Sequence, residues 1–188
     1  SLLHTLTFNQ FEYVHGGGLV DHFDFIDQNN QVLEYLGGAG DDIFTLYDAV
    51  VVPGKINGQG GDDEINYAAY TASGVDVDLA AGTATAIYNA LAGGLSSIER
   101  VIGSALEDTL IGDAWANYLD GGDSADTIRG AGGADSLEGG SGDDTFQFLA
   151  AWSLDELTDL SGLDTLDFTS NSLALRFGID IAGLTISD

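Results

Sequence analysis

Residues 103–147 read GSALEDTLI, GDAWANYLD, GGDSADTIR, GAGGADSLE and GGSGDDTFQ, which are five copies of one nine-residue phrase without a gap. Each copy begins with glycine, has a carboxylate or amide at its sixth residue and has an aliphatic or aromatic residue at its eighth. The sixth residues are Asp108, Asn117, Asp126, Asp135 and Asp144, and the eighth residues are Leu110, Leu119, Ile128, Leu137 and Phe146. The last three residues of a copy are too few for a helix, so they predict a short strand whose eighth residue faces a narrow core.

The front of each copy predicts a turn that binds a cation. Glycine adopts left-handed backbone angles without a steric penalty, and such a turn can point peptide carbonyls inward. Calcium takes six to eight oxygen ligands in flexible geometry, and carbonyls with carboxylates supply them better than imidazole or thiolate. The recurrence of these turns therefore indicates a solenoid that depends on calcium.

The phrase resembles the nonapeptide G-G-x-G-x-D-x-U-x of the RTX (repeats-in-toxin) family of secreted bacterial proteins, where U is a large apolar residue. The resemblance covers residues 11–148 and implies an all-β fold, a parallel β-roll or β-solenoid with calcium-binding glycine-rich turns and a C-terminal capping region. In the family's pattern two repeats make one coil, so turns two copies apart hold one ion between them. This implies the pairs Asp108 with Asp126, Asp126 with Asp144, and Asn117 with Asp135. It also implies backbone ligands at Gly103, Gly121, Asp123, Gly130, Gly132, Gly139 and Ser141.

A sparser set of repeats lies upstream. GGGLVDHFD, GGAGDDIFT and GQGGDDEIN fit the same template, and their starts are 21 residues apart both times. We expect strands and return loops between them, and ions along one edge only, between the first and second turns and between the second and third. The candidate ligands are Gly16, Gly18, Asp21, Gly37, Ala39, Asp42, Gly58, Gly60 and Asp63.

Four segments follow from these patterns. We expect an N-terminal roll with 21-residue spacing over 1–66, a strand insertion over 67–102, the tandem nonapeptide roll over 103–147 and a cap over 148–188. Within the cap, Ser153 and Glu156 have the spacing of a capping box, and Leu154, Leu157 and Leu160 fit one face of a short helix. Asp164 is expected to close one last site against Asp144, and two strands are expected at 173–177 and 184–186.

The charge of the chain is strongly negative. It has 31 acidic and 4 basic residues, for a net charge of -27. Acids at the repeat phase are interpreted as cation ligands, and acids off that phase as surface charge; the latter include Glu12, Asp48, Asp76, Asp78 and Asp155. The acidic field argues against a nucleic-acid partner.

The chain lacks the residues that several classes of function require. The chain has no cysteine, three scattered histidines without an H-E-x-x-H motif, and no EF-hand loop. No apolar run approaches the roughly 20 residues of a membrane span. With no initiator methionine and no signal peptide, we expect a piece of a longer protein exported by type I secretion, as the family resemblance implies.

The sequence therefore predicts a structural, non-enzymatic RTX module of a large secreted bacterial protein that folds on binding calcium outside the cell. One alternative is an accessory or secretion domain of an exported hydrolase. The other is an adhesin module that binds a glycan or a cell surface, with that partner unidentified. Neighbouring sequence would separate the two, because the first requires a catalytic motif upstream and the second requires tandem copies of this unit.

Overall fold

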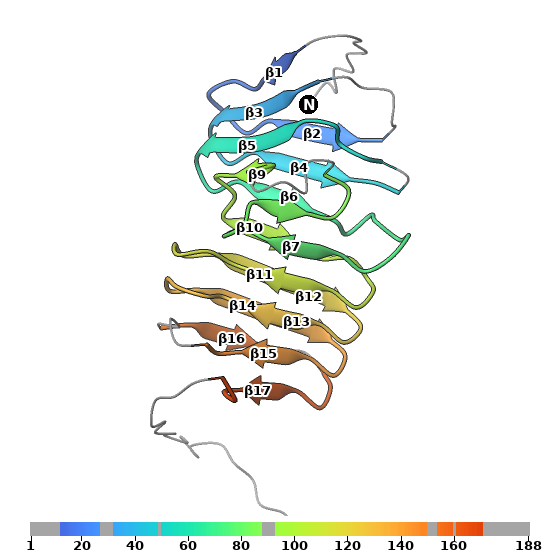
Figure 1. Cartoon of the computed structure of the whole chain (residues 1–188), viewed down its shortest axis with the longest axis vertical. Helices are drawn as coiled ribbons and strands as arrows, with labels where there is room; N and C mark the ends of the chain where they lie inside the picture. The colour runs from blue at the N-terminus through green and yellow to red at the C-terminus, as the bar shows by residue number, and fades with distance from the viewer. Residues whose placement is uncertain are drawn as a thin grey trace, which may run out of the picture.

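The chain forms a parallel β-solenoid, in which short strands stack along one long axis (Figure 1). The computed structural model describes residues 12–26, 32–48, 50–87, 93–149, 154–159 and 161–170. These residues contain seventeen strands and no helix, so none of them forms a helix that could cross a membrane. The all-β roll predicted from the sequence is confirmed.

Three sheets form the walls of the solenoid. The first contains β1 (Tyr13–His15), β3 (Glu34–Ala39), β5 (Lys55–Gly60) and β9 (Leu95–Ser96). The second contains β2 (His22–Phe25), β4 (Ile43–Leu46), β6 (Glu64–Asn66), β10 (Arg100–Ile102), β12 (Tyr118–Asp123), β14 (Ser136–Ser141) and β16 (Glu156–Thr158). The third contains β8 (Thr83–Ala84), β7 (Asp76–Asp78), β11 (Thr109–Ile111), β13 (Thr127–Arg129), β15 (Thr145–Gln147) and β17 (Thr165–Asp167). Paired strands run parallel except β7 with β8, so the second sheet forms a continuous wall along the molecule.

The coil changes length part-way along the chain. In the N-terminal part, Glu34 pairs with Lys55, 21 residues later, and each coil passes from the first sheet to the second. In the C-terminal part, Tyr118 pairs with Ser136, 18 residues later, and each coil passes between the second and third sheets. Two nonapeptides therefore make one coil in this part.

The core is a stack of the apolar residues that end each repeat. In the second sheet, Val101 pairs with Ile65 on one side and Leu119 on the other, and all three are fully buried. In the third sheet, Leu110 and Ile128 stack in the same way. Because alternate residues of a strand face opposite sides, the eighth residue of each repeat points inward and its two neighbours point outward. This confirms the predicted core positions.

Residues 67–102, the expected strand insertion, supply β7 to the third sheet, β9 to the first and β10 to the second. The helix predicted near Glu156 is wrong, since Glu156–Thr158 forms β16. The amide of Glu156 donates to the carbonyl of Asp135 (2.8 Å), and Leu157 pairs with Leu137, so the edge of β14 imposes the strand. The strands predicted at 173–177 and 184–186 lie outside the described residues.

Candidate metal sites

Seven side chains form a line along one edge of the roll, which we call the first edge row. Each member is the residue immediately before a strand of the second sheet. The members are Asp21, Asp42, Asp63, Glu99, Asn117, Asp135 and Asp155. Because the strands of this sheet are stacked in parallel, the residues that precede them are stacked as well.

Hydrogen bonds join most consecutive members of the first edge row. The amide of Asp21 donates to Oδ1 of Asp42 (2.8 Å), and the amide of Asp42 donates to Oδ1 of Asp63 (2.8 Å). Further along, the amide of Asn117 donates to Oδ1 of Asp135 (2.9 Å). The amide of Asp135 donates to Oδ1 of Asp155 (3.2 Å). Each bond holds one side-chain oxygen of the row against the turn of the preceding coil.

A second edge row consists of Asp108, Asp126, Asp144 and Asp164, which precede the strands β11, β13, β15 and β17 of the third sheet. The amide of Asp108 donates to Oδ1 of Asp126 (2.7 Å), and the amide of Asp126 donates to Oδ1 of Asp144 (2.8 Å). The amide of Asp144 donates to Oδ1 of Asp164 (3.1 Å). The two rows bring together every pair named from the sequence, and the role of these residues as metal ligands stays a prediction.

In half of these carboxylates the second oxygen is buried without a hydrogen-bond partner among the described residues. These atoms are Oδ2 of Asp42, Asp63, Asp126, Asp135 and Asp144, on side chains that are at most 2% exposed. A buried carboxylate oxygen without a partner costs far more free energy than a paired one, and a bound cation is the usual compensation. The unpaired oxygens therefore have the chemistry of cation ligands.

Glycine lets these oxygens approach the turn closely. A Cβ atom placed on Gly121 would overlap Oδ2 of Asp126 and lie 2.7 Å from the carbonyl oxygen of Gly139 in the next turn. A Cβ atom on Gly37 would likewise overlap Oδ2 of Asp42 and lie 2.6 Å from the carbonyl oxygen of Gly58. At each of these glycines a carboxylate oxygen and a carbonyl oxygen come close together, and this donor set fits calcium.

Replacing Gly121 with alanine is expected to weaken calcium binding. The added methyl group occupies the space beside Asp126, so the calcium midpoint should rise by roughly 10- to 100-fold, the range usual when the surroundings of a metal site are altered. The measurement is a calcium titration followed by far-UV circular dichroism. Gly60→Ala is the control, because the nearest atom to its added Cβ is 3.8 Å away, and an equal shift in this control would contradict the account.

Asp108 differs from the other members of the second edge row. Its Oδ1 accepts hydrogen bonds from the amide of Val75 (2.7 Å) and the hydroxyl of Ser104 (2.8 Å), and its Oδ2 accepts one from the amide of Ser104 (2.6 Å). Because protein donors already pair with both oxygens, this carboxylate needs a cation less than Asp126 does. Asp108 is the first member of the second edge row, and it lies in the first of the tandem nonapeptides.

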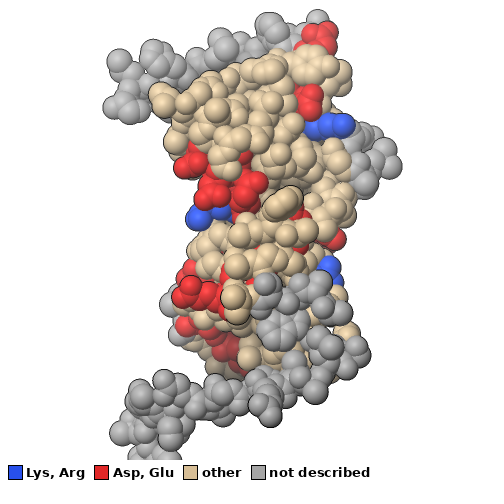
Figure 2. Space-filling model, turned by 90° about the vertical axis from the view of Figure 1, so that its left-hand side faces the viewer, with Lys and Arg blue, Asp and Glu red and all other residues tan. Residues whose placement is uncertain are grey.

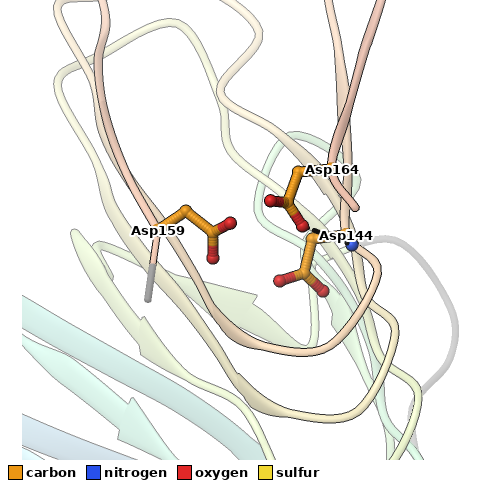
Figure 3. A group of neighbouring side chains, drawn as sticks. All are labelled: Asp144, Asp159 and Asp164. Atoms are coloured by element: carbon orange, nitrogen blue, oxygen red, sulfur yellow. Dashed lines mark hydrogen bonds between the residues drawn. The ribbon is translucent and has the colours of Figure 1, made fainter. Parts of the chain in front are cut away.

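Three carboxylates gather at the C-terminal end of the second edge row (Figure 3). Asp144, Asp159 and Asp164 each place an oxygen within 4.8 Å of the others. Asp159 is aligned with Gly139 of β14, and its Oδ1 lies beside that glycine, where the earlier coils have a backbone carbonyl. The sequence predicted Asp144 and Asp164 as a pair but missed Asp159, because a helix was expected in this segment.

Some predicted backbone ligands lie in the turns as expected, and others have additional partners. In several repeats the carbonyl of the first residue faces the first glycine of the turn one coil earlier. These residues are Gly37, Gly58, Gly121, Gly130 and Gly139. Among the third residues of the repeats, the carbonyl of Gly60 accepts a hydrogen bond from the amide of Gly40 (2.9 Å), and a Cβ atom on Gly18 would meet nothing within 4 Å.

The interpretation of Asp155 is corrected. It was assigned to surface charge, but it lies in the first edge row.

Burial shifts the protonation of both rows. The pKa of Asp126 is raised to about 7 and that of Asp135 to about 6; burial is the largest cause, backbone hydrogen bonds oppose it, and neighbouring carboxylates add to it. Burial also raises the pKa of Asp63, Asp108 and Asp144. Acidic side chains form several patches on the face in Figure 2, whereas basic ones are few, so the protein offers little positive charge to offset the rows.

The ion-free fold is therefore expected to be most stable in acid. Carboxylates with a raised pKa in the folded state stabilise it below their unfolded value, about 3.9, and that stability is lost as pH rises through 6 and 7. In a chelator, the strand signal in circular dichroism should be strongest near pH 4 and fall by pH 8. Dilute solution is needed because the isoelectric point is about 4.1. A strand signal that increases with pH in the chelator would contradict this expectation.

A comparison with protein families identifies the turns. The model of the RTX calcium-binding nonapeptide repeat, which has four copies, matches residues 102–137 and 111–146. Residues 102–146 are RTX repeats. The ion of RTX repeats is calcium, in agreement with the carboxylate and carbonyl oxygens of both edge rows. None of the curated proteins matches the chain.

Proposed function

We propose that this chain is a structural RTX module of a large secreted bacterial protein and that it folds when calcium binds outside the cell. RTX repeats are typical of secreted bacterial proteins. The observation that carries the proposal is the set of buried, unpaired Oδ2 atoms in both edge rows, including those of Asp42 and Asp126. These atoms supply a reason for folding to require a cation.

Charge repulsion supports this coupling. Neighbouring strands of a sheet are about 4.8 Å apart, so carboxylates that precede them are stacked at a similar spacing. At a net charge of -27, the ion-free coil has to bring these charges together without compensation. Calcium removes the repulsion and satisfies the unpaired oxygens, so its binding free energy contributes directly to folding.

The ions have a structural role in this proposal. The carboxylates of the rows are held by backbone amides of the preceding coil, as Asp63 is by the amide of Asp42. Their oxygens are buried between stacked turns, where a cation links two coils and no substrate can approach it. We therefore assign the module to scaffolding of its parent protein and not to catalysis.

Selectivity for calcium tests the proposal. Magnesium demands near-octahedral geometry at short distances and loses water reluctantly, so turns lined by carbonyls should bind it poorly. We expect millimolar calcium to induce the strand spectrum and millimolar magnesium to leave the chain unfolded, with a calcium midpoint of about 10⁻⁴–10⁻³ M, the range of extracellular calcium modules.

The measurement is far-UV circular dichroism of the chain at pH 7.5 in each ion and in both together. A midpoint in the nanomolar range would contradict folding outside the cell. The chain would then bind calcium as tightly as cytosolic calcium-buffer proteins do, and it would fold before export. Equal folding by magnesium would show that the proposed ligand set is wrong.

A further inference from the structure

The two parts of the roll meet at a short turn, Ser97-Ile98-Glu99, which connects β9 to β10. This turn lies outside the residues that match the RTX repeat, and it contains no glycine. It has three residues, whereas the preceding coil has six residues from Gly58 to Asp63, of which the first three belong to β5. The nonapeptide pattern therefore assigns no ion to it.

The backbone nevertheless places Ser97 where a repeat has its first glycine. Ser96 pairs with Asn57, so the next residues, Ser97 and Gly58, are aligned. Ser97 has a φ of 50°, a left-handed conformation that serine seldom adopts. A Cβ atom on Gly58 would overlap both the carbonyl oxygen of Ser97 and Oδ2 of Asp63. This is the arrangement found at Gly37, where the carbonyl of Gly58 and Oδ2 of Asp42 border the space.

Glu99 takes the place of the next aspartate. Its Oε2 accepts a hydrogen bond from the amide of Asp63 (2.9 Å), as Oδ1 of Asp63 accepts one from the amide of Asp42 (2.8 Å). Glutamate is one methylene longer than aspartate, and the segment that ends at Glu99, counted from Ser97, is three residues shorter than the aligned segment from Gly58 to Asp63. The longer side chain therefore reaches the position that the longer segment gives to aspartate.

A buried oxygen in this space lacks a partner among the described residues. Oδ2 of Asp63 is unpaired, and the side chain is 0% exposed. The carbonyl oxygen of Ser97 and the carboxylate of Glu99 accept hydrogen bonds, so neither of these groups donates one to Oδ2 of Asp63. A cation is the partner that satisfies all three groups at once.

We propose that a calcium ion binds between the turns 58–63 and 97–99, held by the carboxylates of Asp63 and Glu99 and the carbonyl of Ser97. This inference rests on the calcium-dependent folding proposed above. The ion joins the 21-residue coils to the 18-residue coils, so the first edge row binds calcium on both sides of the change in coil length. The contact between Arg100 and Glu64 (3.4 Å) links the same two coils on the outer face.

The test counts the ions bound by the whole chain at saturating calcium, by equilibrium dialysis and metal analysis. The variant is Glu99→Gln, which keeps a side-chain oxygen for the amide of Asp63 and removes the charge. The control is Glu12→Gln, which removes the same charge from an exposed residue outside both rows. We expect one ion fewer per chain in Glu99→Gln and the wild-type number in Glu12→Gln.

The outcomes separate this inference from the proposed function. If the wild-type chain binds no calcium, both fail; if it binds calcium and Glu99→Gln binds the same number, only this inference is overturned. If Glu99→Gln does not fold at any calcium concentration, wild-type crystals grown with terbium decide the question. An anomalous peak between Gly58 and Ser97 supports the site, and its absence when other turns have peaks overturns it.

Discussion

Removing calcium from this chain is expected to unfold it. A compact chain of 188 residues has a radius of gyration of about 16 Å and an unfolded one about 46 Å, and an elongated roll lies somewhat above the first value. In a chelator at pH 7.5, the stacked carboxylates of both rows repel one another, and short strands such as β11 bury little apolar surface in compensation. Small-angle scattering should therefore approach the unfolded value.

Adding calcium back should restore the compact form without a refolding aid. Sodium chloride at the same ionic strength is the control, because it screens charge but does not coordinate the unpaired oxygens. If salt alone compacts the chain, the relief of general charge repulsion is sufficient for folding, and specific coordination of calcium is not required. A chain that stays compact in the chelator would contradict the whole account.

Asp126→Asn is expected to have the largest effect of any single change in the second edge row. Asp126 lies between Asp108 and Asp144, and its unpaired Oδ2 faces Gly121 and the carbonyl of Gly139. The change should raise the calcium midpoint by roughly 10- to 100-fold and lower the number of bound ions. The loss should spread to adjacent coils, because solenoid repeats stabilise their nearest neighbours.

Two features make this substitution interpretable. Asn117 already occupies the corresponding position in the first edge row, so the fold accepts an amide there. Asp123→Asn is a matched control, because Asp123 belongs to the same turn and its side chain is exposed. The measurement is a calcium titration of both variants by circular dichroism, with ion counts at saturation. Equal midpoints for the two variants would show that Asp126 is not a ligand.

The sequence predicted all four members of the second edge row and five of the seven members of the first. Glycine at the first position and an acid at the sixth indicated Asp42 and Asp126 correctly as members of stacked rows. Glu99 and Asp155 were missed because their turns lack that glycine pattern. A shorter signal marks both residues, namely an acid two positions before an inward-facing apolar residue, as in Glu99-Arg100-Val101 and Asp155-Glu156-Leu157.

The physical reason for the short signal is the geometry of the strand. The acid ends the turn, the next residue faces outward and the third enters the core, whatever the length of the turn before them. The helix expected near Leu157 failed for a related reason. Leucines three residues apart favour a helix in isolation, but the open edge of β14 offers hydrogen bonds and a stacking partner for Leu157 that local propensity does not include.

The central claim is that calcium ions fold this chain by binding between stacked turns. One titration tests it most directly, with strand content from far-UV circular dichroism and bound calcium measured in the same samples. At pH 7.5 the account predicts that strand signal is absent in the chelator and develops over the range of calcium concentrations in which several ions bind to each chain. Full strand signal in the chelator at this pH, or strand signal that develops without uptake of calcium, would contradict it.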